Sequence, residues 1–310
     1  MLNISFIIVS WNVRELLKRA LQSILADAAE FEFEIIVVDN ASHDSTVEML
    51  RDEFPNVRVI ANTENVGFTR ANNQGLTAAA SGHYIFFLNP DTELERGATR
   101  TLVEYMDAPE NARVGIVGPQ LKYADDSIQS SRRRFPKFST ALFESTKLEQ
   151  WFPHSKPIAD YRFQNTDDNA VQDVDWIVGA AMFLRRAVYE QIGGLDERFF
   201  MYSEELDWCK RAQDAGWRVV YFPQARVLHH EAKSSEQVLA QRDIYFHSSK
   251  VRYFKKHHSV LQGELLRYFL LGMFAFQMLE EGAKYVMGHK RELRKARVKA
   301  YRKVLASELK

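Results

Sequence analysis

The sequence predicts an α/β fold with a mostly parallel central sheet, and three observations support this prediction. Short apolar segments alternate with amphipathic helical segments over the first third of the 310-residue chain. The segment YIFFL at 84–88 is apolar at every position, which is typical of a strand buried on both faces. Polar residues directly follow several of these segments, at the edge where parallel sheets bind ligands.

The first elements follow from local patterns. Residues 4–10 form an expected strand, and Asn12 with Glu15 three residues later has the spacing of a helix capping box. Apolar residues then recur at helical spacing from Val13 to Leu25. Next come an expected strand at 33–39, a helix opened by Ser45 and Glu48, a strand at 56–60, a helix at 69–80 and a strand at 83–89. Alternation at this spacing builds right-handed βαβ units with parallel strands.

The pattern is less regular beyond the segment VGIVGP at 114–119. We expect residues 120–172 to form long loops with short helices, and 174–186 to form two strand-like pieces around Gly179. A helix is expected over 204–215 and is closed by Gly216 in the C-cap position. Two further strand segments follow, at 218–222 and 226–230.

The composition is that of an ordinary globular protein, with 46% hydrophobic and 26% charged residues. Cys209 is the single cysteine, which excludes an internal disulfide and favours a reducing compartment. The first residues lack the basic region and the long apolar run of a secretory signal, so we expect a cytoplasmic protein.

The net charge of zero conceals an asymmetry. Residues 284–310 contain ten Lys/Arg and two Glu, a net charge of +8, so residues 1–283 carry −8. The apolar stretch at 265–279 is shorter than the roughly 18–20 residues of a membrane span. The tail is either a basic amphipathic segment on the anionic cytoplasmic face of the inner membrane or a helical pair packed on the body. No nucleic-acid signature accompanies the basic charge, and a homo-oligomer is left open.

Polar side chains follow three of the predicted strands, and the parallel arrangement should gather them at one edge of the sheet. They are Ser10 and Asn12 after the first strand, Asp39 and Asn40 after the second, and Asn89 and Asp91 after the fourth. Because Pro90 cannot donate to a sheet ladder, the fourth strand must end there. The segment 62–75 is rich in Asn and Gly, which suits close approach of the backbone to a ligand. Neither G-x-G-x-x-G nor a P-loop motif is present, which argues against a dinucleotide fold and a P-loop.

The two aspartates and the two histidines at strand ends could hold a ligand and a cation. Asp39 or Asp91 could accept a hydrogen bond from a base or ribose, while the other holds Mg²⁺ together with substrate phosphates. Alone, either aspartate is more often a turn residue. His229 and His230 stand at a strand end, where an imidazole ligand would suit Mn²⁺ more than Mg²⁺.

Three carboxylates open the helix expected at 204–215. Glu204, Glu205 and Asp207 could simply complement the helix dipole. Alternatively, clustered carboxylates raise one another's pKa, which prepares one of them as a general base.

Arginines and tryptophans supply further candidates with simpler explanations. Arg132, Arg133 and Arg134 could pair with phosphate, although most such runs are solvated. Trp176 and Trp208 could stack on a sugar, but core packing is the favoured interpretation. Cys209 is interpreted as a buried thiol without a catalytic role.

Seven segments, in this order, resemble the bacterial family 2 glycosyltransferases, and within them the rhamnosyltransferase-like subgroup that builds cell-surface polysaccharide. The segments are FIIVSWN, IIVVDNASHDST, NVGFTRANNQG, FLNPDTE, WIVGAAMFLRR, GGLDERFFMYSEELDWCKRAQDAGW and VLHH. The resemblance covers residues 4 to about 258, and the joint order of the motifs makes it specific.

The resemblance implies a GT-A fold, in which a Rossmann-like αβα sandwich surrounds one central sheet. Residues 1–118 would be the nucleotide-sugar-binding half, 119–258 the acceptor-binding and catalytic half, and 259–310 a basic helical extension. It also implies metal-dependent inverting transfer from a nucleotide-diphosphate sugar to a growing, lipid-linked, cell-surface glycan. dTDP-rhamnose is the favoured donor, with UDP-hexoses behind it.

The resemblance also assigns roles to individual residues. The D-x-D metal motif of the family corresponds to Asn89-Pro90-Asp91, so only Asp91 keeps a carboxylate, and His229 would be a further metal ligand. The base would be Glu205, where relatives commonly have Asp, which leaves the choice among Glu205, Glu204 and Asp207 open. The resemblance places Asp39 at the nucleotide and Gly179 and Ala180 at the donor sugar. From the residues themselves, nucleotide-sugar binding is also predicted for Ser10, Asn12, Asn40, Asn65, Gly67, Asn72 and Asn89, and diphosphate or acceptor contacts are predicted for Arg132, Arg133 and Trp176.

Two other classes of protein compete with this interpretation. A nucleotidyltransferase would need a basic Gly-rich loop after the first strand, and SWNVRE is not such a loop. A non-catalytic nucleotide-sugar or lipid-binding protein would not need the acidic trio and the histidine pair. A glycosyltransferase is therefore the favoured prediction.

Overall fold

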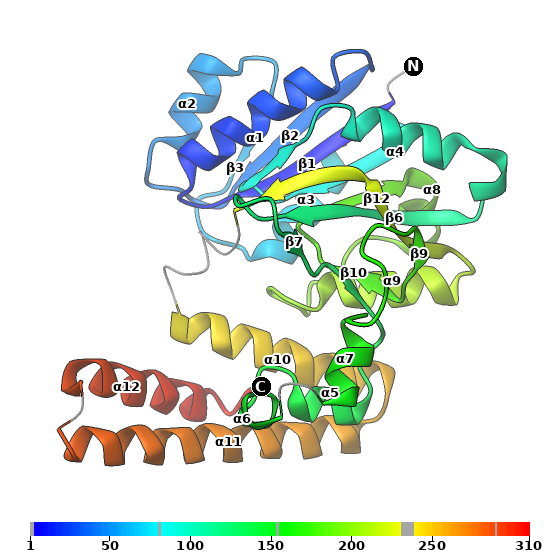
Figure 1. The fold of residues 1–310 in the computed structure, drawn as a ribbon. Coiled ribbons are helices and arrows are strands. Elements are labelled where there is room, and N and C mark those ends of the chain that lie inside the picture. Colours follow the sequence, from blue (N-terminus) through cyan, green and yellow to red (C-terminus); the bar gives the residue numbers. More distant parts are fainter. Residues whose placement is uncertain (1–2, 80–81, 153–154, 231–238, 289) are drawn as a thin grey trace. The chain divides into compact units, whose positions relative to one another are not determined.

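The chain forms two compact units in the computed structural model, which describes residues 3–79, 82–152, 155–230, 239–288 and 290–310 (Figure 1). We call the first the sheet unit; it comprises Met1–Phe135, Arg162–Phe200 and Glu204–Ser234. We call the second the helical unit; it comprises Pro136–Tyr161, Met201–Ser203 and Ser235–Lys310. Both units are assembled from segments that are distant in the sequence.

The sheet unit begins with regularly alternating strands and helices. They are β1 (Ile4–Ser10), α1 (Arg14–Asp27), β2 (Phe33–Asp39), α2 (Thr46–Glu53), β3 (Arg58–Ala61), α3 (Phe68–Ala78), β4 (Tyr84–Leu88), β5 (Thr92–Leu94), α4 (Ala98–Asp107), η1 (Pro109–Asn111) and β6 (Val114–Lys122). The later elements are β7 (Ile128–Gln129), β8 (Arg132–Arg133), β9 (Gln172–Asp173), β10 (Trp176–Ile177), β11 (Ala181–Arg185), α8 (Arg186–Ile192), α9 (Glu204–Asp214) and β12 (Arg218–His229).

The main sheet has the strand order β3-β2-β1-β4-β11-β6-β12-β5, with β7 paired to β6 and β9 paired to β12. The strand β1 pairs in parallel with β2 and β4, and β12 pairs in parallel with β6. The strand β11 is antiparallel to both β4 and β6, so β4, β6 and β12 run in the same direction. The predicted α/β fold with a mostly parallel sheet is therefore confirmed, and the carboxyl ends of β1, β2, β4 and β12 share one edge.

Both faces of the sheet are covered, which explains the continuous apolar strands. Every residue of β1 and β4 is buried. Phe6 and Ile8 pack with Leu21 of α1, whereas Val38 packs on the other face with Ala71 of α3. Figure 1 shows α1 and α2 on one side of these strands. Along β2, Ile35 and Val37 belong to the first cluster and Ile36 and Val38 to the second, so alternate side chains of this strand enter separate clusters.

Helix starts differ from the predicted capping patterns. Helix α1 begins at Arg14 without a side-chain cap, so the capping box expected at Asn12 is wrong. Asn12 instead has a left-handed backbone (φ 53°), and its Oδ1 accepts a hydrogen bond from the His43 N–H at 2.7 Å. Ser45 precedes α2, but its side chain does not cap that helix either. The bond from Asn12 to a distant loop replaces the local cap.

Other boundaries differ by a few residues. The helix expected at 69–80 is α3, which ends at Ala78, and its predicted last position lies outside the described residues. The strand segments expected at 218–222 and 226–230 form one strand, β12, with a register shift between Phe222 and Arg226. The short helices expected within 120–172 are present in the part of that segment that is described.

The helical unit contains α5 (Phe138–Phe143), α6 (Lys147–Trp151), α7 (Lys156–Tyr161), α10 (Leu239–His257), α11 (Val260–Val286) and α12 (Arg291–Ser307). The buried face of α11 carries Leu266, Leu270 and Phe274. A buried ion pair joins α11 to α12, with 2.7 Å between Glu281 Oε2 and Arg294 Nη1. The expected C-terminal pair is α11 and α12, and the functional division predicted at 118 and 258 stays a prediction. Among the described helices, none combines the length and apolarity that crossing a bilayer requires.

Candidate active site

The carboxyl end of β2 holds a buried carboxylate, and one of its two oxygens has no hydrogen-bond partner among the described groups. Asp39 is only 1% exposed, and its Oδ2 accepts a hydrogen bond from the Ser42 N–H at 2.9 Å. Its Oδ1 is buried and has no hydrogen-bond partner among the described groups. The buried hydroxyl of Ser10, at the end of β1, also lacks a partner there. A buried polar atom left unpaired is costly, so both atoms are suited to meet a ligand.

A loop rich in Asn and Gly folds onto this strand end. Asn40 Nδ2 donates to the Gly67 carbonyl at 3.2 Å, and Asn40 Oδ1 accepts from Asn62 Nδ2 at 3.0 Å. Asn65, which is exposed, accepts a hydrogen bond from the Gly67 N–H at 3.0 Å. A Cβ added at Gly67 would lie 2.7 Å from the Phe200 ring. The backbone at Gly67 thus approaches Phe200 closely, and the approach of this segment to a ligand stays a prediction.

Strand pairing places Asp91 beside His229. The strand β5 turns back antiparallel to β12, with Thr92 opposite His229, and the Asp91 carbonyl accepts from the His230 N–H at 2.9 Å. Asp91 Oδ1 and His229 Nε2 then lie 3.4 Å apart. Both residues are 5% exposed. The predicted metal ligands are thus brought together, although 138 residues separate them in the sequence.

The hydrogen bond on the other side of the ring determines what His229 presents to Asp91. Nδ1 of His229 lies 2.8 Å from Gln129 Oε1. That oxygen can only accept, so Nδ1 carries a hydrogen, and the tautomer with its hydrogen on Nδ1 has a lone pair on Nε2. Nε2 is buried without a hydrogen-bond partner among the described residues. A lone pair and a carboxylate that face each other fit a divalent cation between them.

The neighbouring His230 has different surroundings. Its Nε2 lies 2.8 Å from Glu93 Oε1, and Glu93 in turn lies 3.5 Å from Nε of Arg19. The His230 imidazole therefore belongs to a partly exposed chain of polar contacts that runs through Glu93 to Arg19. Of the two imidazoles at the strand end, the one placed beside the Asp91 carboxylate is that of His229.

The protein supplies only part of a metal coordination shell here. Within the described ranges, no group of three or more His, Cys, Asp and Glu side chains could hold a metal ion. Asn89, the first residue of the predicted D-x-D counterpart, donates its backbone N–H to the Ala180 carbonyl at 2.8 Å. Asp91 and His229 would thus be two ligands of a cation that needs others, as Mg²⁺ and Mn²⁺ sites completed by substrate phosphates do.

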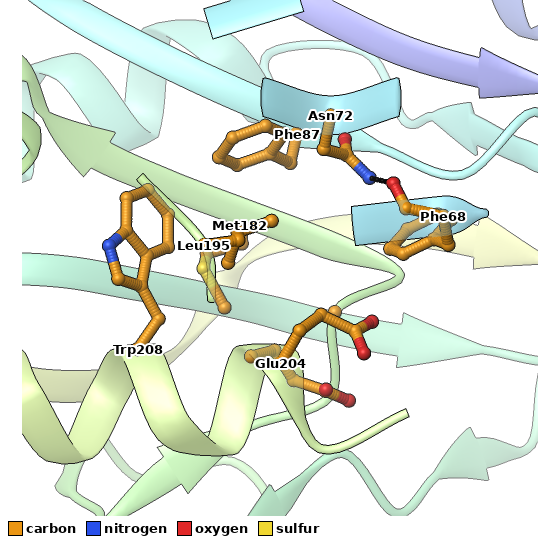
Figure 2. Close-up of a pocket in the computed structure, with 9 residues that line it drawn as sticks. Phe68, Asn72, Phe87, Met182, Leu195, Glu204 and Trp208 are labelled. Atoms are coloured by element: carbon orange, nitrogen blue, oxygen red, sulfur yellow. Dashed lines mark hydrogen bonds between the residues drawn. The ribbon is translucent and has the colours of Figure 1, made fainter. Parts of the chain in front are cut away.

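A second cluster lies around a pocket between α3, β4, β11 and α9. Its lining residues are Phe68, Asn72, Phe87, Gly179, Met182, Leu195, Glu204, Glu205 and Trp208. Figure 2 shows Glu204 on one side of this pocket and Asn72 on the other, with apolar side chains between them. Asn72 donates to the Phe68 carbonyl at 2.9 Å, and a Cβ at Gly179 would lie 3.5 Å from Glu205. Four predicted site residues, Asn72, Gly179, Glu204 and Glu205, are therefore brought together.

Glu204 and Glu205 have different environments. Glu204 is 4% exposed, and its Oε2 has no hydrogen-bond partner among the described groups. Burial, reinforced by the charge of Glu205, raises the pKa of Glu204 well above its usual range, which favours the protonated acid. Glu205 as a whole residue is half-buried, although its Oε2 is also buried. The two neighbours therefore differ in the burial of the whole side chain, and both line the pocket.

Asp207 has a different position from the other two carboxylates. It is 0% exposed, and its Oδ2 accepts from Arg211 Nε at 2.9 Å. The same guanidinium donates to the carbonyls of Ile192 and Gly194, each at 2.7 Å. Asp207 is not among the residues that line the pocket. Asp207 thus holds the Arg211 side chain, which links α9 to the end of α8 and the loop that follows it.

The two residues before α9 have unusual backbone angles. Tyr202 and Ser203 both have left-handed φ values, 68° and 66°. Consecutive non-glycine residues in this region store strain, which is more common at functional sites than elsewhere. Trp208 and Cys209 on the same helix are core residues, as expected, and burial raises the pKa of the Cys209 thiol to about 12.

The predicted diphosphate or acceptor contacts lie in the antiparallel ribbon of β8 and β10. Arg132 is 4% exposed, forms an ion pair with Asp168, and stacks 4.7 Å from the centre of the Tyr221 ring. Arg133 Nη1 donates to Ser130 Oγ at 2.9 Å, and the buried Trp176 donates to the Arg134 carbonyl at 2.9 Å. None of these side chains lines the pocket. Their contacts to a substrate stay a prediction.

Sequence reasoning missed Gln129, the residue that orients His229. It stands in the two-residue strand β7, one hundred positions before its partner. A strand this short has no recognisable period, and nothing local links it to a histidine at another strand end.

The profile of the family described as Glycosyl transferase family 2 matches residues 5–193, more than half of the chain. The chain belongs to this family. It is therefore a glycosyltransferase, and the nucleotidyltransferase and binding-protein alternatives are set aside.

Similar sequences include two bacterial rhamnosyltransferases. The chain is 30% identical over 271 residues to the N-acetylglucosaminyl-diphospho-decaprenol L-rhamnosyltransferase of Mycobacterium tuberculosis (strain CDC 1551 / Oshkosh), covering 84% of this chain and 87% of the relative. It is 24% identical to Rhamnosyltransferase WbbL of Escherichia coli (strain K12), over 80% and 90% of the two chains. The resemblance to rhamnosyltransferase-like members of the family is confirmed.

Solved structures confirm the GT-A fold. GalNAc-T7, solved with UDP, GalNAc and Mn²⁺, superposes with a TM-score of 0.60 at 16% identity, covering 82% of this chain and 48% of the other. The mannosyltransferase PcManGT of Pyrobaculum calidifontis, solved with GDP-Man and Mn²⁺, gives a TM-score of 0.55 at 17% identity, covering 99% and 86%. At these identities the likeness concerns the fold alone.

Two glycines with positive φ provide a test of the loop packing. Gly67 has φ 91° and ψ 161°, and an added Cβ would meet the Phe200 ring at 2.7 Å and its carbonyl at 2.9 Å. Gly97 has φ 86° and ψ 0°, with no atom within 4 Å of an added Cβ. We expect Gly97→Ala to lower the free energy of unfolding by about 1 kcal/mol. Gly67→Ala should lower the free energy of unfolding by about 2 kcal/mol more than Gly97→Ala does. Its added Cβ would be overpacked against Phe200, and its backbone would also be strained.

Urea unfolding of the two variants and the parent chain measures this difference. An equal decrease in the free energy of unfolding for Gly67→Ala and Gly97→Ala would show that Phe200 does not pack tightly on the loop.

Proposed function

We propose that this chain is a metal-dependent, inverting glycosyltransferase that transfers rhamnose from dTDP-rhamnose to a lipid-linked glycan. The observation that carries the metal and diphosphate part is the facing pair of Asp91 Oδ1 and His229 Nε2, 3.4 Å apart and buried at the carboxyl edge of the sheet. The names of the two rhamnosyltransferase relatives support the choice of sugar. The lipid-linked acceptor is supported by the diphospho-decaprenol in the name of the mycobacterial relative.

The nucleotide would lie against the ends of β1 and β2. Asp39 Oδ1 is an acceptor without a partner among the described groups, so it suits the N–H of a base or a ribose hydroxyl. The loop held by Asn40 and Gly67 borders the same strand end. This position agrees with the general location of ligands outside the carboxyl ends of parallel strands.

Asp91 and His229 would hold a divalent cation together with diphosphate oxygens and water. The cation would neutralise charge on the departing diphosphate when it is bound. The imidazole nitrogen favours Mn²⁺ over Mg²⁺, whereas the carboxylate accepts either ion. Gln129 contributes by keeping the His229 lone pair directed at Asp91.

Glu205 is the proposed base. In an inverting transfer, the acceptor hydroxyl oxygen forms a bond to the anomeric carbon while the bond from that carbon to the diphosphate breaks, and the hydroxyl proton passes to the Glu205 carboxylate. Glu204 is enclosed and its pKa is raised, so we assign it a protonated, hydrogen-bond-donating role beside the base. Asp207 is engaged with Arg211 and is assigned to the support of α9.

The apolar pocket lining supports a 6-deoxy sugar. Phe87, Met182, Leu195 and Trp208 line the pocket beside the two glutamates. A methyl group would bury apolar surface there, whereas a hydroxymethyl group would lose hydrogen bonds to water. Apolar pockets discriminate weakly against an added hydroxyl, by up to about 100-fold.

A donor screen tests the proposed function. We expect transfer from dTDP-rhamnose, with kcat/KM about 10- to 100-fold above that for dTDP-glucose or UDP-hexoses. Release of the nucleotide diphosphate in the presence of Mg²⁺ or Mn²⁺ would be measured, with a polyprenyl-diphosphate-linked N-acetylglucosamine as the acceptor. A clear preference for a UDP-hexose would contradict the rhamnose assignment.

The metal ligands can be tested by substitution with a matched control. We expect Asp91→Asn and His229→Gln each to weaken Mn²⁺ binding in the presence of dTDP by at least about tenfold, because each removes one protein ligand. His230→Gln, at the neighbouring position, should leave binding within about twofold, because His230 contacts Glu93 instead. Electron paramagnetic resonance of free Mn²⁺ gives these affinities. A stronger loss in His230→Gln than in His229→Gln would contradict the assignment.

The base assignment predicts different results for the two adjacent glutamates. Glu205→Gln should lower kcat by about 10²- to 10⁴-fold, because no general base then accepts the proton of the acceptor hydroxyl. Donor binding should be retained. Glu204→Gln preserves a hydrogen-bond donor and should lower kcat by less than about tenfold. Steady-state kinetics and isothermal titration with dTDP separate the two effects. Full turnover by Glu205→Gln would exclude it as the base.

A further inference from the structure

Exposed apolar side chains are concentrated in the helical unit. Sixteen large hydrophobic side chains are exposed among the described residues, and twelve of them belong to this unit. Single exposed apolar residues are normal on protein surfaces, but contiguous patches usually mark an interaction site. The helical unit therefore has a surface that needs an explanation.

Most of the exposed apolar surface forms one stripe on α11. Its large members are Leu261, Leu265, Tyr268, Phe276, Leu279 and Val286, which are 69%, 52%, 63%, 47%, 69% and 77% exposed. Gly272 and Ala283 fill the two remaining positions of a repeat with steps of three or four residues, so the stripe is straight and carries no charge. At 1.5 Å per residue, it is about 37 Å long. The opposite face of the helix carries the buried residues Leu266, Leu270 and Phe274.

An exposed tryptophan widens this stripe. Trp151 of α6 is 54% exposed, and its ring lies edge-on to Phe276 at 6.0 Å between centroids. Arg267 stacks on Tyr268 at 4.5 Å, and Arg291 lies 5.9 Å from the ring of Tyr285. Aromatic side chains flanked by cations are typical of surfaces at the boundary between lipid headgroups and acyl chains.

The charge of the unit is strongly positive. The helical unit contains 19 Lys/Arg and 10 Asp/Glu, a net charge of +9, whereas the sheet unit carries −9. Helix α12 packs against α11 and exposes a row of basic residues, Arg291, Lys295, Lys299 and Arg302, at steps of four or three. Clusters of Lys and Arg next to an apolar helix face favour anionic lipid surfaces, by about 1 kcal/mol per basic residue near the membrane.

We infer that the apolar stripe of α11 and the basic row of α12 form a surface that docks on an anionic bilayer. A chain that binds through an amphipathic helix face lies in the plane of the membrane surface. A second copy of this chain is a less suitable occupant, because two units of charge +9 would repel each other across a shared apolar face. The inference rests on the proposed function in one respect: membrane docking would give the enzyme access to a lipid-linked acceptor.

Vesicle binding of the full chain tests this inference without donor or acceptor. We expect the chain to sediment with vesicles of phosphatidylglycerol and phosphatidylcholine, and not with phosphatidylcholine alone. Binding should fall several-fold between 0.1 M and about 0.5 M NaCl, because salt screens the basic row. A chain that transfers sugar to a soluble acceptor but does not bind vesicles would overturn the docking inference and leave the proposed function intact.

Matched variants locate the surface. Leu265→Glu combined with Leu279→Glu should reduce partition to anionic vesicles by at least about tenfold, because two apolar contacts are replaced by charges. Leu25→Glu, an exposed leucine of the sheet unit, should leave partition unchanged. Arg302→Glu should weaken binding more than Arg51→Glu, which makes the same charge change on α2. Thermal unfolding checks that each variant is folded.

Two further results would overturn the inference. The first is equal vesicle binding by the Leu265/Leu279 variant and the parent chain. The second is a dimer of the parent chain in sedimentation velocity that this variant dissociates, because the stripe would then be an interface between two copies.

Discussion

The burial of β1 and β4 on both faces is the constraint on which the site depends. Neither strand can place a polar side chain in its middle without a cost, so polar groups collect where the strands end. Pro90 ends β4 abruptly, and the chain turns back as β5 to pair with β12. That pairing sets Asp91 beside His229, although neither residue is near the other in the sequence. The apolar strands thus determine where charged chemistry can occur.

Burial makes a missing hydrogen bond costly, so the buried polar atoms without partners among the described groups are suited to contact a ligand. Asp39 Oδ1, His229 Nε2 and Glu204 Oε2 are each enclosed, and each comes from a different part of the fold. The first suits a hydrogen-bond donor, the second a cation and the third, when protonated, an acceptor. A nucleotide-diphosphate sugar bound with a metal ion presents all three kinds of partner. This match connects the family membership to the chemistry of these particular residues.

Local patterns predicted the main elements to within a few residues, because the strand and helix periods are local properties. They also predicted Asp91, His229 and Glu205 as candidates, since these residues stand at predicted element ends. The contacts that define the site could not be predicted in this way. Gln129 with His229 and Phe200 with Gly67 join positions about 100 or more residues apart. The cap expected at Asn12 failed for the same reason, because a hydrogen bond from His43 replaced it.

The central claim is that Asp91 and His229 are the metal ligands supplied by the described part of the chain, and that the nucleotide diphosphate supplies others. The affinity for Mn²⁺, measured by electron paramagnetic resonance with and without dTDP, tests this claim most directly. Two protein ligands alone should bind Mn²⁺ weakly, and dTDP should tighten binding by at least about tenfold, with a reciprocal gain in dTDP affinity. An affinity for Mn²⁺ that is the same with and without dTDP would contradict the account.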